Sequence, residues 1–218
     1  MRVIDENIKY QLNTANNTAK VIGYKDEPID VKIPEYVEYE TKKYKVTSIG
    51  NDAFFNCESL ISIDIPDSVI YIRFSAFAHC SSLSSITISD SVTYIGSCAF
   101  YNVGLTLPKR YTEDGRLIAY KVFNGDMTCR DFQYEEGKTY EIEGEIKSCF
   151  RGFHACINLL DVFNYYWGTI DKDVVIHEVY LSGDIDDTKT FDSKVCSSKI
   201  EIGRRLSLKD INNIINYK

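Results

Sequence analysis

The sequence lacks the long apolar run that a membrane-spanning helix needs, because no stretch of about 18 apolar residues occurs in it. Its first residues, Met-Arg-Val-Ile-Asp-Glu-Asn, also lack the apolar segment that is typical of a secretory signal peptide. The seven cysteines are an odd number. Without a signal peptide, the simplest interpretation is that they are reduced thiols. We therefore expect a cytoplasmic protein with no membrane partner.

A concentration of basic residues is missing as well. The 25 Lys and Arg residues are outnumbered by 32 Asp and Glu residues, which gives a net charge of −7, and the sequence has no basic stripe. Nucleic-acid-binding proteins neutralise phosphates with clustered Lys and Arg, so direct binding of nucleic acid is not predicted. An acidic protein can still bind a basic protein, including one that holds nucleic acid.

Motifs for cofactors and metals are also absent. The sequence has no glycine-rich phosphate-binding loop and no paired Cys-x-x-Cys ligands. Cys149, His154 and Cys156 lie close together in the sequence and form one alternative, a zinc site. A nucleophilic pair of Cys129 or Cys156 with His154 or His177 is another. Structural thiols and a structural histidine are the prediction, with no cofactor and no metal.

The sequence does contain an internal repeat with a period of 23 residues. Val46-Thr-Ser-Ile-Gly-Asn-Asp-Ala-Phe54 returns in similar form as 69–77 and 92–100. A fixed period of about 20 to 50 residues is typical of a solenoid, in which one unit stacks on the next. Each repeat has a Leu-x-x-Ile-x-Ile and a Val-x-x-Ile cluster, whose alternation of apolar and polar residues predicts strands. The Ala-Phe pairs of the three repeats are expected to stack as an aromatic column inside the coil.

These residues resemble the BspA-like family of leucine-rich repeats. Its elements Ile-Pro-Asp-Ser-Val, Ile-Gly, Ala-Phe and Asn-Cys-x-Ser-Leu occur in the expected order. Segments before the repeats, such as Thr18-Ala-Lys-Val-Ile-Gly-Tyr24, are similar to the β-rich cap of that family. The resemblance covers about residues 1–108. It implies an N-terminal β cap at 1–45 and three repeats at 46–108, in a short solenoid with at least two strands per turn.

Outward positions on the repeat strands form the predicted partner-binding surface. Tyr71 and Tyr94 fall in register on successive Val-x-x-Ile strands, and Arg73 replaces the glycine of the other two repeats. Exposed Tyr and Arg side chains are typical of protein interfaces. A simple cross-strand aromatic ladder is the alternative interpretation. The residues predicted to contact a protein partner are Tyr71, Arg73, Thr93, Tyr94, Asp64 and Thr87.

The size of this surface limits what it can hold. Three rungs about 4.8 Å apart, with strands of about 15–20 Å, give a face of roughly 200–300 Å². A standard interface buries about 800 Å² on each partner. The repeats therefore need the cap, the C-terminal half or a second copy of the chain to complete a binding surface. Edge-to-edge pairing into a homodimer is one such alternative.

The C-terminal half mixes strand and helix signals, which predicts a small α+β domain at 109–218. Strands are predicted at Arg116–Phe123, Val174–Leu181 and Lys199–Ile202. A helix is predicted at Asn158–Tyr166, with Asn158 as its N-cap, and Ser207-Leu-Lys-Asp210 resembles the capping box of a final helix. The predicted fold class for the whole chain is α+β, with the short β-rich leucine-rich-repeat solenoid and its N-terminal cap preceding this domain.

Segments of this half also resemble an uncharacterised domain of phage and bacterial proteins. The resemblance rests on Ala119–Arg130, Phe132–Tyr140, Gly152–Cys156 and Ser193–Gly203. It brings no assigned chemistry, but it implies a phage or mobile-element protein and hence the cytoplasm of a bacterial host. The resulting hypothesis is a non-enzymatic protein-binding module that binds and inhibits a host defence protein.

Two other functions are kept as alternatives. The sequence has a first strand with Tyr120, then Gly152-Phe-His-Ala before a helix ending in Tyr165-Tyr166, and then a further strand. This order of elements is similar to that of ADP-ribosyltransferases, which use NAD. The resemblance implies that Tyr120, His154, Tyr165 and Glu178 would act in such an enzyme or be left over in an inactive relative. Tyr120 departs from the His or Arg that those enzymes have on the first strand. The third alternative is a self-assembling structural protein.

Overall fold

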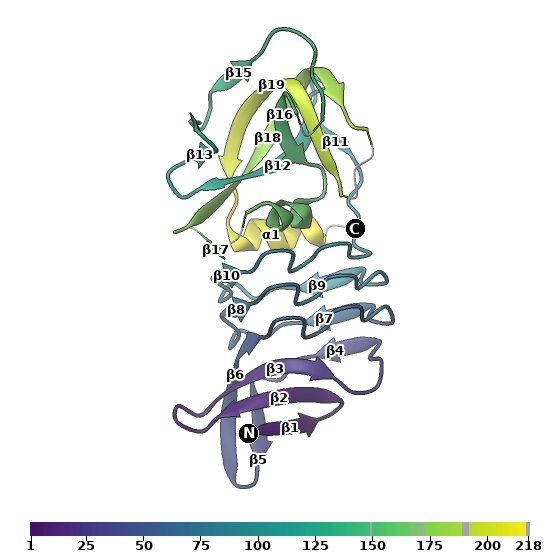
Figure 1. Ribbon diagram of the computed structural model, residues 1–218, viewed down its shortest axis with the longest axis vertical. Helices are drawn as coiled ribbons and strands as arrows, with labels where there is room; N and C mark the ends of the chain where they lie inside the picture. The colour runs from purple at the N-terminus through teal and green to yellow at the C-terminus, as the bar shows by residue number, and fades with distance from the viewer. Residues whose placement is uncertain (149, 167, 171, 189–191, 217–218) are drawn as a thin grey trace.

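The computed structural model describes residues 1–148, 150–166, 168–170, 172–188 and 192–216. A β-solenoid of stacked coils forms one end and continues into a small, strongly curved β-sheet domain at the other (Figure 1). The described residues include one 3-10 helix and one α-helix. The predicted fold class, a β-rich solenoid followed by a small α+β domain, is confirmed.

Six strands form the N-terminal end of the solenoid and lead into the first repeat. They are β1 (Arg2–Asp5), β2 (Ile8–Asn13), β3 (Thr18–Tyr24), β4 (Asp30–Lys32), β5 (Tyr36–Tyr39) and β6 (Lys42–Ile49). Every second side chain of β2 is buried, as expected for a strand with one face on a core. β1, β2 and β3 pair antiparallel, and β3 then pairs in parallel with β6. The N-terminal strands therefore continue directly into the stack of coils.

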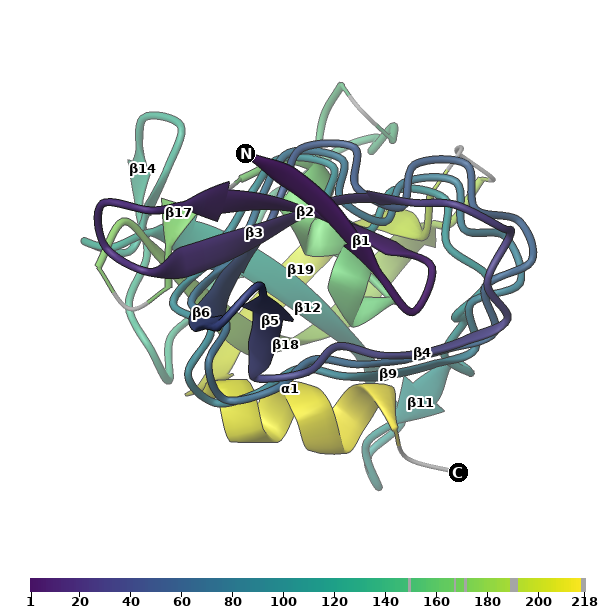
Figure 2. The same cartoon turned by 90° about the horizontal axis from the view of Figure 1, so that it is seen from below.

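Each of the next two repeats adds one strand to each of two parallel stacks. β8 (Tyr71–Ile72) and β10 (Tyr94–Ile95) extend the sheet of β6, while β7 (Ser62–Asp64) and β9 (Ser85–Thr87) extend that of β4. Seen along the stack, the coils superpose closely (Figure 2). Tyr71 is paired with Tyr94, and Ile63 with Ile86. Residues 23 positions apart are therefore neighbours, as the period predicts.

An aromatic column runs through the centre of the solenoid. The rings of Phe54, Phe77 and Phe100 are fully buried and stack nearly parallel, with centroids 5.4 and 5.5 Å apart. Tyr24 continues the column at the N-terminal end, 5.9 Å from Phe54, and Phe163 closes it at the other end, 6.3 Å from Phe100. The predicted stacking of the Ala-Phe pairs is confirmed.

The C-terminal half contains a closed ring of four antiparallel strands. β12, β16, β19 and β18 pair in a cycle that returns to β12. A separate apolar cluster, which includes Phe123, Val179 and Ile202, fills this small barrel. The elements of this half are β11 (Arg110–Tyr111), β12 (Leu117–Asn124), β13 (Thr128–Cys129), β14 (Phe132–Gln133), β15 (Thr139–Glu141), β16 (Phe153–Cys156), the 3-10 helix η1 (Leu159–Asn164), β17 (Gly168–Thr169), β18 (Val174–Asp186), β19 (Lys194–Arg205) and α1 (Leu208–Ile215).

The C-terminal half also closes the open end of the solenoid. β17 pairs antiparallel with β10, so the solenoid sheet does not end at the last repeat. η1 and α1 lie between the last coil and the barrel (Figure 1). One buried apolar cluster runs without interruption from Ile8 to Ile215. The barrel domain and the repeats therefore share a core.

The predicted helix at Asn158–Tyr166 is shorter and tighter than expected. Only Leu159–Asn164 is helical, and the helix is of the 3-10 type. Asn158 occupies the N-cap position but makes no capping bond; its amide Nδ2 donates instead to the carbonyl oxygen of Leu105, at 2.8 Å. The side chain is diverted because the last coil of the solenoid has a buried carbonyl that needs a donor.

The capping box predicted for the final helix is confirmed. The Ser207 hydroxyl accepts from the Asp210 amide, and the Asp210 carboxylate accepts from the Ser207 amide. The Ser207 hydroxyl, the Arg204 guanidinium and the Ser207 amide all donate to the Asp210 carboxylate, in this order of effect, and lower the pKa of Asp210 to about 2. Ile211 and Ile215 of this helix are buried against the solenoid core, which Ile214 borders.

Candidate functional site

The tyrosine ladder on the solenoid is formed as the repeat register predicts. The rings of Tyr71 and Tyr94 are 6.2 Å apart and tilted, and Tyr71 is 40% exposed. The Arg73 guanidinium lies over the Tyr71 ring, 5.2 Å from its centroid. Arg73 Nε also donates to the Ser48 hydroxyl at 3.2 Å, which fixes the arginine across neighbouring coils. The result is an ordered aromatic and cationic edge whose role in binding stays a prediction.

The six residues predicted to contact a partner lie on two faces. Tyr71 and Tyr94 belong to β8 and β10, while Arg73 directly follows β8 and Thr93 directly precedes β10. Asp64 and Thr87 are exposed and paired in register, but they belong to β7 and β9 of the second stack. The chain therefore does not bring the six residues together into one surface.

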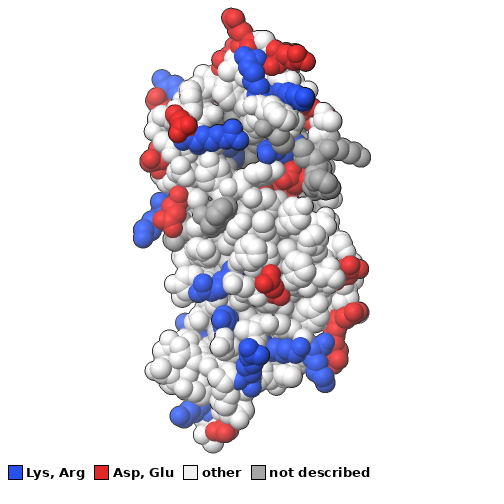
Figure 3. Space-filling view, in the orientation of Figure 1, with Lys and Arg blue, Asp and Glu red and all other residues white. Residues whose placement is uncertain are grey.

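An exposed phenylalanine beside the ladder, Phe74, was not among the predicted contact residues. Phe74 directly follows Arg73 and is 51% exposed. The equivalent positions of the other two repeats are polar, Asn51 and Ser97, and this break in the pattern was the available signal. Residues 74–108 contain a single charged side chain, Asp90. Figure 3 shows the corresponding band over the solenoid as largely uncharged, with acidic and basic groups gathered toward the two ends.

A second candidate site is a pocket of about 530 Å³ in the barrel domain. β12 and β16 share one pair, Tyr120 with Cys156, and no pairing continues beyond it. The pocket lies where these strands separate, next to the loop after β13 and the end of η1. Side chains that line it include Lys121, Cys129, Phe132, His154, Tyr165 and Tyr166.

Lys121 occupies the gap between the two strands. Its ammonium Nζ donates to the backbone oxygen of His154 at 2.9 Å and lies 5.4 and 5.6 Å from the ring centroids of Phe123 and Tyr134. The residue is only 8% exposed. Burial lowers the pKa of this amine. Among the described residues, no carboxylate forms an ion pair with it.

The lining of the pocket is basic although the chain is acidic. Arg130, Arg151 and Lys194 line it together with Lys121, against one acidic residue, Asp131. Burial, and then the positive charges of Lys194, Lys121 and Arg130, lower the pKa of the His154 imidazole to about 4. These three cations therefore all disfavour protonation of the His154 imidazole, which is neutral at pH 7.

Three of the four residues considered for an NAD-dependent enzyme line this pocket: Tyr120, His154 and Tyr165. The Tyr120 ring is buried, and its hydroxyl accepts a hydrogen bond from Arg110. The Tyr165 hydroxyl donates to Asp192, and Lys194 Nζ lies 4.0 Å from the Tyr165 ring centroid. These tyrosines are thus engaged within the protein, and only part of the proposed catalytic set is assembled.

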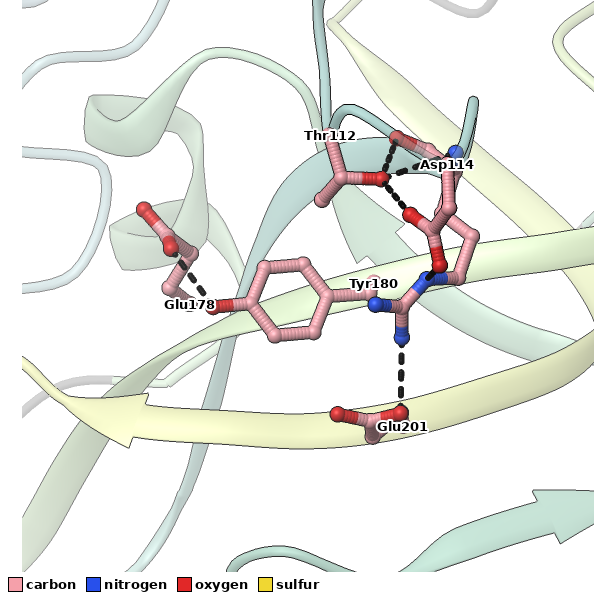
Figure 4. A network of polar contacts seen from close by, with 6 residues as sticks. Thr112, Asp114, Glu178, Tyr180 and Glu201 are labelled. Carbon is pink, nitrogen blue, oxygen red and sulfur yellow. Dashed lines mark hydrogen bonds and ion pairs between the residues drawn. The ribbon is translucent and has the colours of Figure 1, made fainter.

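Glu178, the fourth of these residues, belongs to a polar network outside the pocket (Figure 4). Its carboxylate accepts from the Tyr180 hydroxyl at 3.0 Å and lies 3.6 Å from the Arg110 guanidinium. In the same network, the Arg116 guanidinium lies over the Tyr180 ring and bridges to nearby carboxylates. A general acid or base tied into such a network does not face a ligand in the pocket.

The zinc alternative gains no support from the geometry, whereas Cys129, Cys156 and His154 of the thiol alternative line one pocket. Cys149 lies outside the described residues, and within the described ranges no three His, Cys, Asp or Glu side chains form a metal-binding group. His177 is buried, with Nδ1 2.9 Å from the Gly203 carbonyl oxygen and its ring edge-on to Phe123.

In the described part of the chain, no helix is long and apolar enough to cross a membrane.

The stability of the protein should depend on the protonation of His154. Because the pKa of His154 is about 4 in the folded state, against an ordinary value of 6.5, the unfolded chain binds more protons between these pH values. Stability is therefore present above about pH 6.5 and lost as the pH falls through about 4. Allowing for partial solvent screening, we expect wild type to lose about 1–2 kcal/mol more than His154→Gln between pH 7 and pH 4.5. Urea titrations at both pH values measure this difference, and identical losses would contradict it.

Comparison with known proteins gives two family matches. Residues 37–129 match the family described as BspA type Leucine rich repeat region (6 copies). Residues 117–214 match a Domain of unknown function (DUF7666). No curated protein matches the chain.

Solved structures of bacterial leucine-rich repeat proteins are similar to part of the chain. One from Bacteroides ovatus has 30% identity and a TM-score of 0.41 over 46% of this chain and 33% of its own. One from Bacteroides capillosus has 32% identity and a TM-score of 0.41 over 43% of this chain and 70% of its own. A leucine rich cell surface protein from Faecalibacterium prausnitzii has 32% identity and a TM-score of 0.41 over 47% and 29%. The chain therefore spans about a third of the first and third of these proteins.

Proposed function

Because residues 37–129 belong to the BspA-type leucine-rich repeats, we propose that the chain is a non-enzymatic protein-binding module. Repeats of this kind are typical of protein-interaction modules, since their stacked units present a regular, extended surface. The observation that carries the proposal is the exposed edge of Tyr71, Arg73 and Phe74 along coils that have few charges. Aromatic and arginine side chains with little charge around them are the usual composition of an interface centre.

The continuation of the solenoid sheet supports a larger contact area than three repeats alone provide. β3 and the strands before it extend this sheet at one end, and β17 extends it at the other, which together with β5 beside β6 gives eight strands. A composite surface of this kind approaches the area that a stable interface needs. The N-terminal strands and the barrel domain would thus add to the face that carries the ladder.

A host defence protein is the partner that we propose in addition. The resemblance of the C-terminal half to domains of phage and bacterial proteins motivates this choice. The net charge of −7 suits a partner with a basic surface, such as a nuclease. The proposal predicts that the retained partner is basic and that adding the chain inhibits its activity on nucleic acid.

The test is a quantitative pull-down from bacterial lysate with the immobilised full chain. We expect one protein to be retained by wild type and its recovery to fall at least tenfold with Tyr71→Ser/Phe74→Ser, because the substitution removes the aromatic contacts. Ile61→Ser is the matched control, since Ile61 is exposed but lies just before β7 on the other stack. Equal recovery with both variants would contradict the proposal. Light scattering on the free chain separates this result from homodimer formation through the same edge.

A further inference from the structure

We propose that the pocket between β12 and β16 binds a small organic anion with a planar ring, about the size of a nucleoside monophosphate. This inference is independent of the proposed protein-binding function, which rests on the solenoid. The chemical class of the ligand follows from three features of the pocket: a buried lysine that forms no ion pair with a carboxylate in the described part of the chain, a basic lining and exposed aromatic rings.

The buried basic group is Lys121. Burial lowers the pKa of its amine, because the charged form is stable inside a protein only when it is paired or solvated. Lys121 Nζ has the carbonyl oxygen of His154 at 2.9 Å and the Cys129 thiol as partners, but no ion pair with any carboxylate in the described part of the chain. An anion entering the pocket would supply the missing negative charge, so the ligand needs an acidic group that reaches this depth.

Further basic side chains line the same cavity as Lys121. Arg130 and Lys194, like Lys121, lie close enough to His154 to disfavour its protonated form. The Arg151 guanidinium is held at the pocket by bonds to the backbone oxygens of Glu143 and Glu145, not by their carboxylates. Several cations around one cavity match the two negative charges of a phosphate better than the single charge of a carboxylate.

Aromatic side chains line the same pocket. Phe132 and Phe150 are 47% and 77% exposed. The Phe132 ring is supported by Tyr134 and Tyr140, with centroids 4.7 and 5.3 Å away. Flat rings of this kind bind the face of a nucleobase or a similar planar group. The ligand that satisfies both features therefore joins a planar ring to a phosphate.

The volume of the pocket restricts the ligand to a small molecule. About 530 Å³ falls within the range of roughly 300–1,000 Å³ that is typical of small-molecule sites. A folded protein or a nucleic-acid duplex does not enter such a space. Adenosine monophosphate (AMP) is a suitable probe because it has the ring, the phosphate and the size.

The test is isothermal titration calorimetry of the full chain with AMP, adenosine and inorganic phosphate. We expect AMP to bind at least tenfold more tightly than either fragment, because only AMP meets both the cations and the rings. Lys121→Met should weaken AMP binding at least tenfold, and Arg130→Gln should weaken it about threefold or more. The control is Lys209→Met, which removes an exposed lysine of α1 that does not line the pocket and should leave binding unchanged.

Two results of the AMP titrations would overturn the proposal. AMP that does not bind at millimolar concentration, or that binds no better than adenosine, would show that the cations do not recognise an anion. AMP binding that is unchanged in Arg130→Gln and Lys121→Met would place the ligand elsewhere. Should Lys121→Met not fold, the exposed Arg130 and Phe132 decide the question through Arg130→Gln and Phe132→Ala, and unchanged binding in both overturns it.

Discussion

Replacing Phe163 with alanine is expected to lower the free energy of unfolding by about 3–5 kcal/mol, the usual cost of removing a buried phenylalanine. Phe163 is 0% exposed, and its ring lies 6.3 Å from that of Phe100, the last member of the solenoid column. The side chain comes from η1 of the barrel domain. Its loss leaves a cavity where the two halves of the chain share their core, and neither half can move freely to fill it.

Urea denaturation followed by circular dichroism measures this cost. The matched control is Phe150→Ala, which removes a ring that is 77% exposed and should change stability by less than about 0.5 kcal/mol. We also expect one cooperative transition for wild type, because a single buried cluster joins the repeats to η1 and α1. Equal losses in the two variants, or an unchanged solenoid transition in Phe163→Ala, would contradict a shared core.

Asn212→Ala is expected to destabilise the protein by about 2–3 kcal/mol, since it leaves buried backbone groups without partners. The Asn212 amide lies beside β9 as a further strand would, with Oδ1 accepting from the Ile88 amide at 3.0 Å and Nδ2 donating to the Ile88 oxygen. Asn216 adds a bond from Nδ2 to the Ile86 oxygen at 2.8 Å. Two asparagines at the end of α1 thus supply hydrogen-bond partners for the backbone groups at the open edge of the second stack.

Asn213→Ala is the control for this prediction, because Asn213 lies on the same helix and is exposed. Both variants replace an asparagine of α1 with alanine, so the change in helix propensity is the same in each. The difference in their urea midpoints therefore reports the bonds to Ile88. A difference below about 0.5 kcal/mol would show that water replaces the asparagine at this edge.

The repeats could be predicted from the sequence because every coil gives the same position the same surroundings. Ile63 and Ile86, or Phe77 and Phe100, are neighbours in space as well as equivalents in the repeat. A break in the pattern is then informative by itself. Phe74, which stands where the other repeats have Asn51 and Ser97, could have been identified in this way.

The barrel domain was predicted less completely because its pattern depends on pairings between distant strands. Strands were expected at Val174–Leu181 and Lys199–Ile202, but β18 and β19 are longer and include buried polar residues such as Ser197 and Ser198. Closure into a ring buries these positions, and no local periodicity reports it.

The pocket could not be predicted because it exists where β12 and β16 fail to pair. The sequence nevertheless contained a signal for the pocket, because Lys121 lies on the same inward face of β12 as the buried Ala119 and Phe123. A lysine on such a face is either a core residue at high cost or part of a binding site. Of the four residues considered for an enzyme, Tyr120, His154 and Tyr165 line the pocket and Glu178 does not, and a catalytic role for them stays a prediction.

The identical edges of successive coils make the solenoid a spacer with a fixed unit of length. Inserting one further block of 23 residues would present the same edge to β17 and α1 as the present last repeat does, and would move the pocket away from the N-terminus by about 4.8 Å. Shorter insertions would put the wrong side chains against Phe163 and Asn212. Homologous chains could therefore adjust the distance between a solenoid partner and the pocket in whole steps, without redesigning either end.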